Sequence, residues 1–172
     1  VYVTNYGSNN VSKIVGGVVT ATIAVGTNPY GVAVASDGTV YVTNYGSNTV
    51  SKIVGGVVTA TIAVGTRPTA VVVASDGSIY VTNNSTNNVS KIVGGVVTAT
   101  ISVGTQPEDV AQAPDGSIYV TNRGTNNVSK IVGDVVTATI AVGSSPYGVA
   151  VASNGTVYVA NSSSNTVSVI SP

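Results

Sequence analysis

The chain repeats itself every 39 residues. The unit VYVTN, read as IYVTN or VYVAN in the later copies, begins at Val1, Val40, Ile79, Ile118 and Val157. The first two repeats, residues 1–39 and 40–78, are identical at 33 of 39 positions. A fixed period of roughly 20 to 50 residues is the signature of solenoids, propellers and arrays. A local function must therefore lie at the few positions that differ between repeats.

The composition indicates the secondary structure of these units. The chain is built largely from Val, Ala, Ile, Thr, Ser, Asn and Gly, and it lacks Cys, Met, Trp, Phe and His. β-Branched residues favour strands, whereas Asn, Ser and Gly favour turns. We therefore predict one all-β repeat domain over residues 1–172. It contains about 4.4 repeats: 1–39, 40–78, 79–117, 118–156 and the partial repeat 157–172.

The charge balance excludes several classes of partner. Only 7% of the residues are charged, and six Lys and Arg balance six Asp and Glu. No overall field therefore attracts nucleic acid or an anionic membrane. No apolar run reaches the roughly 20 residues of a membrane-spanning helix, and the lack of Cys excludes thiolate metal ligation. We expect no nucleic-acid partner, no membrane insertion and no cofactor. The start at Val1 without Met indicates a processed chain or a piece of a longer one.

Each repeat contains four apolar runs of strand length. In residues 28–65 these runs are GVAVA (31–35), VYVTN (40–44), VSKIV (50–54) and VVTATIAV (57–64). The dipeptides Asp37-Gly38 and Gly55-Gly56 supply the positive φ angles of tight hairpins. Pro68 cannot donate to a strand ladder and is expected to end the fourth run. Each repeat is predicted to be a four-stranded antiparallel meander.

The faces of these strands favour sheets arranged around an axis. Val32 and Val34 lie on one side of the first strand, with Ala33 and Ala35 on the other. A strand that is apolar on both faces must be covered on both. The fourth strand alternates apolar residues with Thr, as expected farther from the centre. This gradient favours a β-propeller, or a segment of one, over a flat β-solenoid, and it makes the innermost strand the most crowded.

The repeat resembles that of the YVTN-family β-propellers. The segments VYVTN, SNTVSKI, ATIAVG and PYGVAVASDGT carry the resemblance, which covers the whole chain. Members of this family are surface-layer and other exported proteins of archaea and bacteria. The resemblance thus implies four-stranded propeller blades and an extracellular or cell-surface location. It implies no particular activity, because one repeat scaffold serves many functions.

The strand count leaves the closure of the ring open. In the family's usual convention GVAVA is the innermost strand a and ATIAV the outermost strand d. The chain then reads bcd, abcd three times, and abc, so both ends carry strands b and c. The alternatives are a closed ring of four or five blades with an incomplete blade at the seam, an arc that associates with other chains, and a fragment of a larger propeller. The last two are favoured, because an open arc exposes two apolar blade faces.

Three recurring polar positions are interpreted as structural. One tyrosine per repeat recurs in register: Tyr2, Tyr41, Tyr80, Tyr119 and Tyr158. These rings are expected to pack between blades with their hydroxyls at a polar edge.

The third strand carries one lysine in four repeats: Lys13, Lys52, Lys91 and Lys130. That row suits a solvated outer face or protection against edge-to-edge pairing. The a–b hairpins carry Asp37, Asp76, Asp115 and Asn154 before Gly. This is turn chemistry, and no second carboxylate completes a calcium site, so no metal is expected.

Catalytic groups are nearly absent. Without His or Cys there is no imidazole base, no thiolate nucleophile and no His-bound metal. Virginiamycin B lyase-like enzymes have similar propeller repeats, and that resemblance implies chemistry that depends on His and Glu. This chain has no His and a single glutamate, Glu108. Its neighbour Asp109 points to the opposite side of an extended chain, which suits paired acid–base work poorly. We expect the protein not to be an enzyme.

The differences between repeats concentrate in two connections. The d–a connection reads TNPYG, TRPTA, TQPED and SSPYG, and the b–c connection reads NYGSNN, NYGSNT, NNSTNN, NRGTNN and NSSSNT. In a four-stranded meander these connections emerge on one face and the DG and GG hairpins on the other. Loops on a rigid scaffold are the usual seat of recognition, and neutral drift of exposed loops after duplication is the alternative.

Eight residues of this variable rim are candidate ligand-binding residues: Tyr6, Tyr30, Tyr45, Tyr147, Arg67, Glu108, Asp109 and Arg123. If the chain curls round, the four tyrosines are expected toward one end of the rim and the charged residues toward the other. Tyrosine rings stack on sugar rings or apolar ligands, and the surrounding Asn, Ser and Thr hydrogen-bond hydroxyl groups.

Three functional hypotheses follow. The leading one is a non-enzymatic extracellular scaffold, a self-assembling surface protein whose partners are other copies of itself or neighbouring blades. Near-identical repeats, low charge and mismatched ends favour it. The second is a lectin-like or adhesive module that binds glycans or cell-surface polymers through the variable rim. The third is a consensus-like sequence selected only for folding, which would show high stability and no ligand.

Overall fold

The computed structural model describes all 172 residues, which form eighteen strands in five antiparallel sheets. Each sheet is one blade, and its strands pair in the order of the sequence. Blade 1 consists of β1 (Tyr2–Asn5), β2 (Asn10–Val15) and β3 (Val18–Ala24). Blade 2 consists of β4 (Pro29–Val34), β5 (Val40–Asn44), β6 (Thr49–Val54) and β7 (Val57–Ala63). Blade 3 consists of β8 (Pro68–Val73), β9 (Ile79–Asn83), β10 (Asn88–Val93) and β11 (Val96–Ser102). Blade 4 consists of β12 (Pro107–Gln112), β13 (Ile118–Asn122), β14 (Asn127–Val132) and β15 (Val135–Ala141). Blade 5 consists of β16 (Pro146–Val151), β17 (Val157–Asn161) and β18 (Thr166–Ile170).

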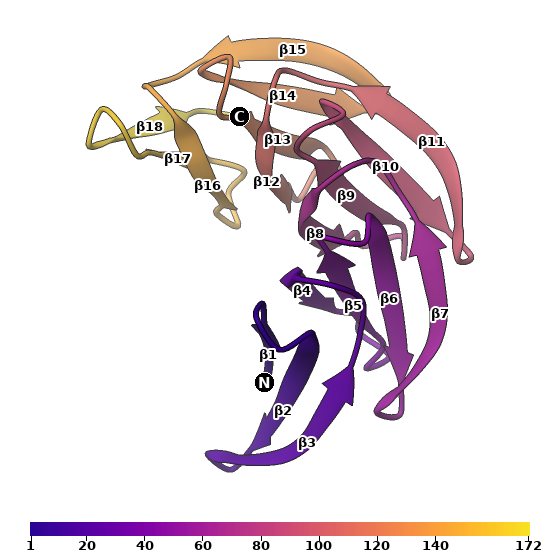
Figure 1. Cartoon of the computed structure of the whole chain (residues 1–172). Helices are drawn as coiled ribbons and strands as arrows, with labels where there is room; N and C mark the ends of the chain where they lie inside the picture. The colour runs from indigo at the N-terminus through magenta and orange to yellow at the C-terminus, as the bar shows by residue number, and fades with distance from the viewer.

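The five blades form an open arc (Figure 1). Strands β4, β8, β12 and β16 line its inside, while β3, β7, β11 and β15 run along its outside. The predicted four-stranded meander and the eighteen strands are therefore confirmed. The first and last blades stand at the two free ends of the arc and are not paired with each other. None of the elements is a long apolar helix of the kind that crosses a bilayer.

The prolines begin the inner strands, whereas the sequence suggested only that Pro68 ends the strand before it. Pro29 is the first residue of β4 and pairs with Asn44, and the register then shifts so that Val32 pairs with Val42. A proline is tolerated at the first residue of a strand or at a bulge, because neither place needs its missing N–H group. This bulge recurs in blades 3, 4 and 5.

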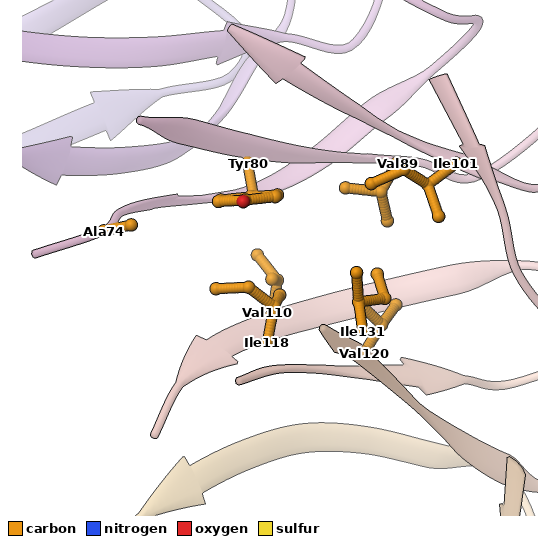
Figure 2. Packing of buried hydrophobic residues seen from close by; sticks show 8 residues of the cluster. All are labelled: Ala74, Tyr80, Val89, Ile101, Val110, Ile118, Val120 and Ile131. Atoms are coloured by element: carbon orange, nitrogen blue, oxygen red, sulfur yellow. The ribbon is translucent and has the colours of Figure 1, made fainter. Parts of the chain in front are cut away.

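The core lies between consecutive blades. Between blades 3 and 4, Tyr80 and Val89 face Val110, Ile118 and Val120 (Figure 2). The second strand of each middle blade is the most buried, and every residue of β9 and β13 is buried. The inner strands are only half-buried, which corrects the expectation that they are the most crowded. The physical reason is that their inner edge faces the open interior of the arc instead of another sheet.

The recurring tyrosines pack between blades where a next blade exists. Tyr80 and Tyr119 are buried in inter-blade clusters, which confirms that expectation. The lysines are more than solvated surface residues. Lys91 Nζ lies 5.6 Å from the Tyr80 ring centroid and 2.9 Å from Asp134 Oδ1 in the c–d hairpin of the next blade. This hydrogen bond raises the pKa of Lys91. Lys91 therefore helps to join blades 3 and 4, whereas Lys130 Nζ lies 3.6 Å from Asp115 Oδ2 of its own blade.

Candidate functional site

The two variable connections lie together on one rim, as the sequence predicted. The Tyr45 amide donates to the Asn28 carbonyl over 3.0 Å, and the Gly46 amide donates to Thr27 over 2.9 Å. Each d–a connection is thus bonded to the b–c turn of the blade that it enters. The Asn of the VYVTN unit sits against the same loop, since a Cβ on Gly26 would lie 2.6 Å from Asn44 Cγ. The glycine is needed there for close approach.

The Thr of the VYVTN unit joins each blade to the next at this rim. Thr43 Oγ1 accepts a hydrogen bond from the Gly31 amide over 2.7 Å and donates to the Thr69 carbonyl of the next blade over 2.6 Å. Thr121 Oγ1 likewise donates over 2.8 Å to the Tyr147 carbonyl. Each such bond fixes the second residue of the following inner strand.

These fixed residues line a pocket of about 290 Å³ at the rim. Two repeat positions supply all eight lining residues. The second residue of each inner strand supplies Tyr30, Thr69, Glu108 and Tyr147, and the first residue of each b–c turn supplies Tyr6, Tyr45, Asn84 and Arg123. Both positions vary between repeats. The pocket is therefore lined by residues that differ between the repeats, in a chain whose repeats are otherwise nearly identical.

Three tyrosines form one side of the pocket. The Tyr6 and Tyr30 rings meet edge to face with centroids 6.5 Å apart, and the Tyr45 ring lies 6.1 Å from Tyr30 and 6.3 Å from Tyr6. Across the arc, the Tyr30 and Tyr147 hydroxyls are hydrogen-bonded to each other, which joins the inner strands of blades 2 and 5. That bond, together with burial, raises the pKa of Tyr30. This part of the rim is held together across 117 residues of sequence.

An ion pair forms another part of the wall. The Glu108 side chain is only 8% exposed, and its Oε1 accepts a hydrogen bond from Asn84 Nδ2 over 3.2 Å. Arg123 Nη1 lies 3.6 Å from the same oxygen. Burial raises the pKa of Glu108, and Arg123 opposes this effect. The tyrosines and these two charged residues thus share one pocket, which corrects the expectation that they lie at opposite ends of the rim.

Two of the eight candidate residues do not line this pocket. Arg67 lies beside it, with its guanidinium carbon 5.6 Å from the Tyr45 ring centroid. Asp109 is half-buried, and its carboxylate accepts hydrogen bonds of 2.9 Å from the Val110 and Val149 amides. Burial raises the pKa of Asp109. Asp109 therefore joins blade 4 to β16 of blade 5 instead of facing the rim.

Sequence reasoning missed Thr69 and Asn84, which also line the pocket. Both occupy the same repeat positions as the tyrosines and Glu108, so their place in the repeat was the available signal. They were passed over because neither carries a ring or a charge. In the structure, Asn84 orients Glu108, while the Thr69 hydroxyl hydrogen-bonds to Thr82 over 2.8 Å.

The N-terminal end of the arc presents a second candidate surface, the N-face, formed by Val1, Val3, Ile14 and Val19 of blade 1. Val3 is 41% exposed, whereas Val81, at the same repeat position in blade 3, is fully buried. Val1 and Val19 are also exposed. In the middle blades these repeat positions pack against the preceding blade. The N-face is therefore half of an inter-blade interface without its other half.

The C-terminal end presents the complementary surface, the C-face, formed by Tyr158, Ala160, Val167 and Val169 of blade 5. Val167 is 61% exposed, whereas its equivalent Val128 is fully buried. Val169 stands where the other four repeats carry Lys, and Ala160 stands where they carry Thr. The uncovered face thus has two apolar residues at positions that are polar in every other repeat.

Comparison with known proteins identifies the class of the fold. No protein-family profile matches the chain, and no curated protein sequence matches it. Among solved structures, the chain superimposes over 92% of its length on hydrazine synthase from Kuenenia stuttgartiensis, with a TM-score of 0.85 and 23% identity, covering 51% of that chain. Virginiamycin B lyase from Staphylococcus aureus matches over 99% of this chain and 65% of its own, with a TM-score of 0.85 and 15% identity. The WD40 β-propeller domain of Doa1 matches over 94% of this chain and 57% of its own, with a TM-score of 0.82 and 16% identity.

These likenesses show that the chain has a β-propeller fold, built from four-stranded antiparallel blades. At such identities they show the fold alone, because propellers serve many unrelated functions. The chain spans between about half and two thirds of the length of the structures that it matches.

Proposed function

We propose that the protein is a non-enzymatic scaffold that self-associates through the two end faces of its arc. The observation that carries this proposal is the exposure of Val3 and Val167 at repeat positions that are fully buried in the middle blades. Exposed apolar patches of this kind mark association surfaces, because burying them in a partner removes them from water. The partner is a second copy of the chain, whose opposite end face repeats the pairing seen between consecutive blades.

The two faces are complementary, not alike. The C-face corresponds to the side of a blade that meets the next blade, and the N-face to the side that meets the preceding one. Such a contact is head-to-tail, and repeated head-to-tail contacts give closed rings or open filaments. The replacement of Lys by Val169 and of Thr by Ala160 supports burial of the C-face. An unpaired lysine or threonine there would have to lose its hydration when covered.

The non-enzymatic part of the proposal rests on the side chains of the chain. It has no His and no Cys, so it has neither an imidazole base nor a thiolate nucleophile. A histidine-to-alanine variant of virginiamycin B lyase is described as catalytically inactive. Hydrazine synthase and the lyase are enzymes that share the fold. Sharing a fold does not imply sharing catalytic residues, so this likeness is no argument for activity in this chain. The resemblance to YVTN-type surface-layer repeats supports an extracellular or cell-surface location.

The first test is the native mass of the 172-residue chain by analytical ultracentrifugation over a concentration series. The proposal predicts that the mass grows with concentration. A strict monomer at the highest soluble concentration would overturn it.

Variants then locate the contact. Val167→Lys places a charge on the C-face at a position that is fully buried in the middle blades, and Val3→Lys places a charge of the same sign on the N-face. Each variant alone should remain monomeric. An equimolar mixture should form dimers and nothing larger, because only one intact C-face to N-face junction is available. Val57→Lys is the matched control, since Val57 is equally exposed but lies away from both end faces, and it should assemble like the parent. Assembly that is insensitive to both end-face variants would contradict the proposal.

A further inference from the structure

We propose that the rim pocket is a binding site for one ring of a neutral saccharide. This inference is independent of self-association, because the pocket lies on the rim and the association surfaces lie on the end faces. It rests on the charge, the chemistry and the size of the pocket wall, taken in turn below.

The charge of the wall selects a neutral ligand. The Glu108 carboxylate would repel an anionic ligand, and the Arg123 guanidinium would repel a cationic one. These two groups lie only 3.6 Å apart. A ligand of either sign would meet one like charge at close range in a partly desolvated site. A cation held by the tyrosine rings is disfavoured further, because the Arg67 guanidinium already lies 5.6 Å from the Tyr45 centroid. A neutral ligand meets neither penalty.

The polar groups of the wall suit hydroxyl groups. Glu108 Oε1 is engaged by Asn84 and Arg123, but no group of the protein donates to Oε2. The Arg123 guanidinium donates no hydrogen bond within the protein and meets Glu108 only as an ion pair at 3.6 Å. The wall therefore offers a charged acceptor beside a charged donor. A sugar hydroxyl can donate to the first and accept from the second, and hydrogen bonds to charged groups are the stronger ones.

The remaining wall suits the apolar face of a sugar ring. Tyr6 and Tyr45 present rings beside Tyr30, with centroids between 6.1 and 6.5 Å apart. Neither the Tyr6 hydroxyl nor the Tyr45 hydroxyl has a partner within the protein. An aromatic surface with a polar tip contacts the C–H face of a pyranose and its equatorial hydroxyls together. At about 290 Å³ the pocket lies just below the roughly 300–1,000 Å³ of sites for drug-sized ligands. It is thus sized for a single ring, with the next unit of a chain outside.

The pocket is assembled, not accidental, because Thr43 and Thr121 hold two of its lining residues from the preceding blades. Its lining comes from four consecutive b–c turns and the four inner strands that follow them. A ligand seated there contacts residues from blade 1 to blade 5. Binding is therefore expected to stabilise the arc.

The test is isothermal titration of the Val167→Lys variant, which is designed to be monomeric and has an unaltered pocket. The probes are the methyl glycosides of glucose, galactose, mannose and N-acetylglucosamine, together with cellotriose and chitotriose. We expect saturable binding of at least one probe and a higher melting temperature in its presence. Absence of binding to all six probes would overturn the proposal.

Variants identify the site. Glu108→Gln should weaken binding by about tenfold to 100-fold, because a hydrogen bond to a charged group is lost. Tyr6→Ala removes an exposed ring that makes no side-chain hydrogen bond, so it should weaken binding without loss of the fold. Asp115→Asn and Tyr158→Ala are matched controls away from the pocket, and Tyr158 is as exposed as the pocket residue Tyr147, at 44%. Folding of each variant is checked by circular dichroism. Binding that is unchanged in folded Glu108→Gln and Tyr6→Ala would also contradict the proposal.

Discussion

The middle blades and the end blades follow the same repeat but differ in what covers them. In blades 2, 3 and 4, both faces of the sheet pack against a neighbour. The valines and isoleucines of their second and third strands are almost fully buried, except for Val54, Val93 and Val132 at the ends of the third strands. In blades 1 and 5 one face has no neighbour, and equivalent valines are exposed. A valine at the same repeat position is thus buried or exposed depending on whether another blade packs against its face. This is the behaviour of a repeat array whose stability comes from nearest-neighbour interfaces.

The comparison also separates two kinds of sequence change. At the uncovered C-face, the repeat positions of Thr and Lys have become Ala160 and Val169, which makes the surface more apolar. At the rim, the lining positions have become Tyr, Thr, Asn, Glu and Arg, which makes the surface chemically diverse. The first change suits packing against another blade, and the second suits recognition of a ligand.

The largest expected effect compares one isoleucine in its two settings. Ile92→Ala, in blade 3, should lower the free energy of unfolding by about 2–5 kcal/mol, because Ile92 is buried between blades and its loss leaves a cavity. Ile14→Ala, at the same repeat position on the N-face, should cost less than half as much. Both are measured by urea denaturation in the Val167→Lys background, which is designed to keep the N-face uncovered. Equal losses would show that the end blade is packed as tightly as the middle ones.

A second comparison concerns the threonine that joins blades. Thr121→Ala removes the acceptor for the Asp109 amide at 3.0 Å and the donor to the Tyr147 carbonyl at 2.8 Å. Leaving these groups unpaired should cost about 1–3 kcal/mol. The reciprocal change Ala160→Thr should stabilise the fold by less, at most about 1 kcal/mol. Its hydroxyl can accept from the Gly148 amide of its own blade, as Thr43 accepts from Gly31, but in this structure it has no neighbouring inner strand to which it can donate. Thermal unfolding of both variants checks this, and a gain from Ala160→Thr as large as the loss from Thr121→Ala would contradict the blade-joining role of the threonine.

Much of this architecture could be predicted from the repeat. The strand limits, the tight hairpins and the shared rim of the two variable connections all follow from patterns within 39 residues. The shape of the arc could not be predicted, because the angle between blades is set by packing across sheets and by no local pattern. The sequence predicts that Tyr30 and Tyr147 come together at the rim if the chain curls round, and they do, but it does not predict that Glu108 and Arg123 lie beside the tyrosines.

Asp109 shows the same limit at one residue. Alternation along a strand predicts that it points away from Glu108, whereas its charge and its place in a variable connection make it a candidate rim residue. What the sequence does not reveal is the hydrogen-bond donor, the Val149 amide of the next blade, which lies 2.9 Å from Asp109 Oδ2. A carboxylate that joins two blades looks, in sequence, like any other variable loop residue.

The junction made by Asp109 can be tested through pH. Because burial raises the pKa of Asp109, the folded chain binds its proton more tightly than the unfolded chain does. The contribution of this group to stability should therefore fall as the pH rises from the unfolded pKa of about 4 through the folded pKa. Removing the group with Asp109→Asn should make the stability difference, variant minus parent, increase with pH. The measurement is the unfolding free energy of both proteins between about pH 3.5 and 7.

The control for this slope is Asp37, a carboxylate whose pKa is shifted in the opposite direction. The Thr39 amide donates to Asp37 and lowers its pKa, so this group stabilises the fold above its unfolded pKa and the benefit is lost as the pH falls. For Asp37→Asn, variant minus parent should therefore decrease with rising pH. Slopes of the same sign for the two variants would contradict the role assigned to Asp109.

The smallest expected effect compares the loops that enter blades 2 and 4. The residue before Pro has a positive φ in each, 52° at both Asn28 and Gln106, and its amide donates to an Asn side chain at the equivalent place. Asparagine tolerates this left-handed conformation better than glutamine does, because its short side chain can hydrogen-bond locally. In addition, Asn28 Nδ2 donates over 3.3 Å to the Tyr6 carbonyl in the b–c turn of the preceding blade. Gln106→Asn should therefore stabilise the fold by up to about 1 kcal/mol, and Asn28→Gln should destabilise it by a similar amount. For a domain of this size that is a shift of about 2–4 °C in Tm in each direction. If both exchanges instead shift Tm in the same direction, the two loops are not equivalent in energy despite their equal backbone angles.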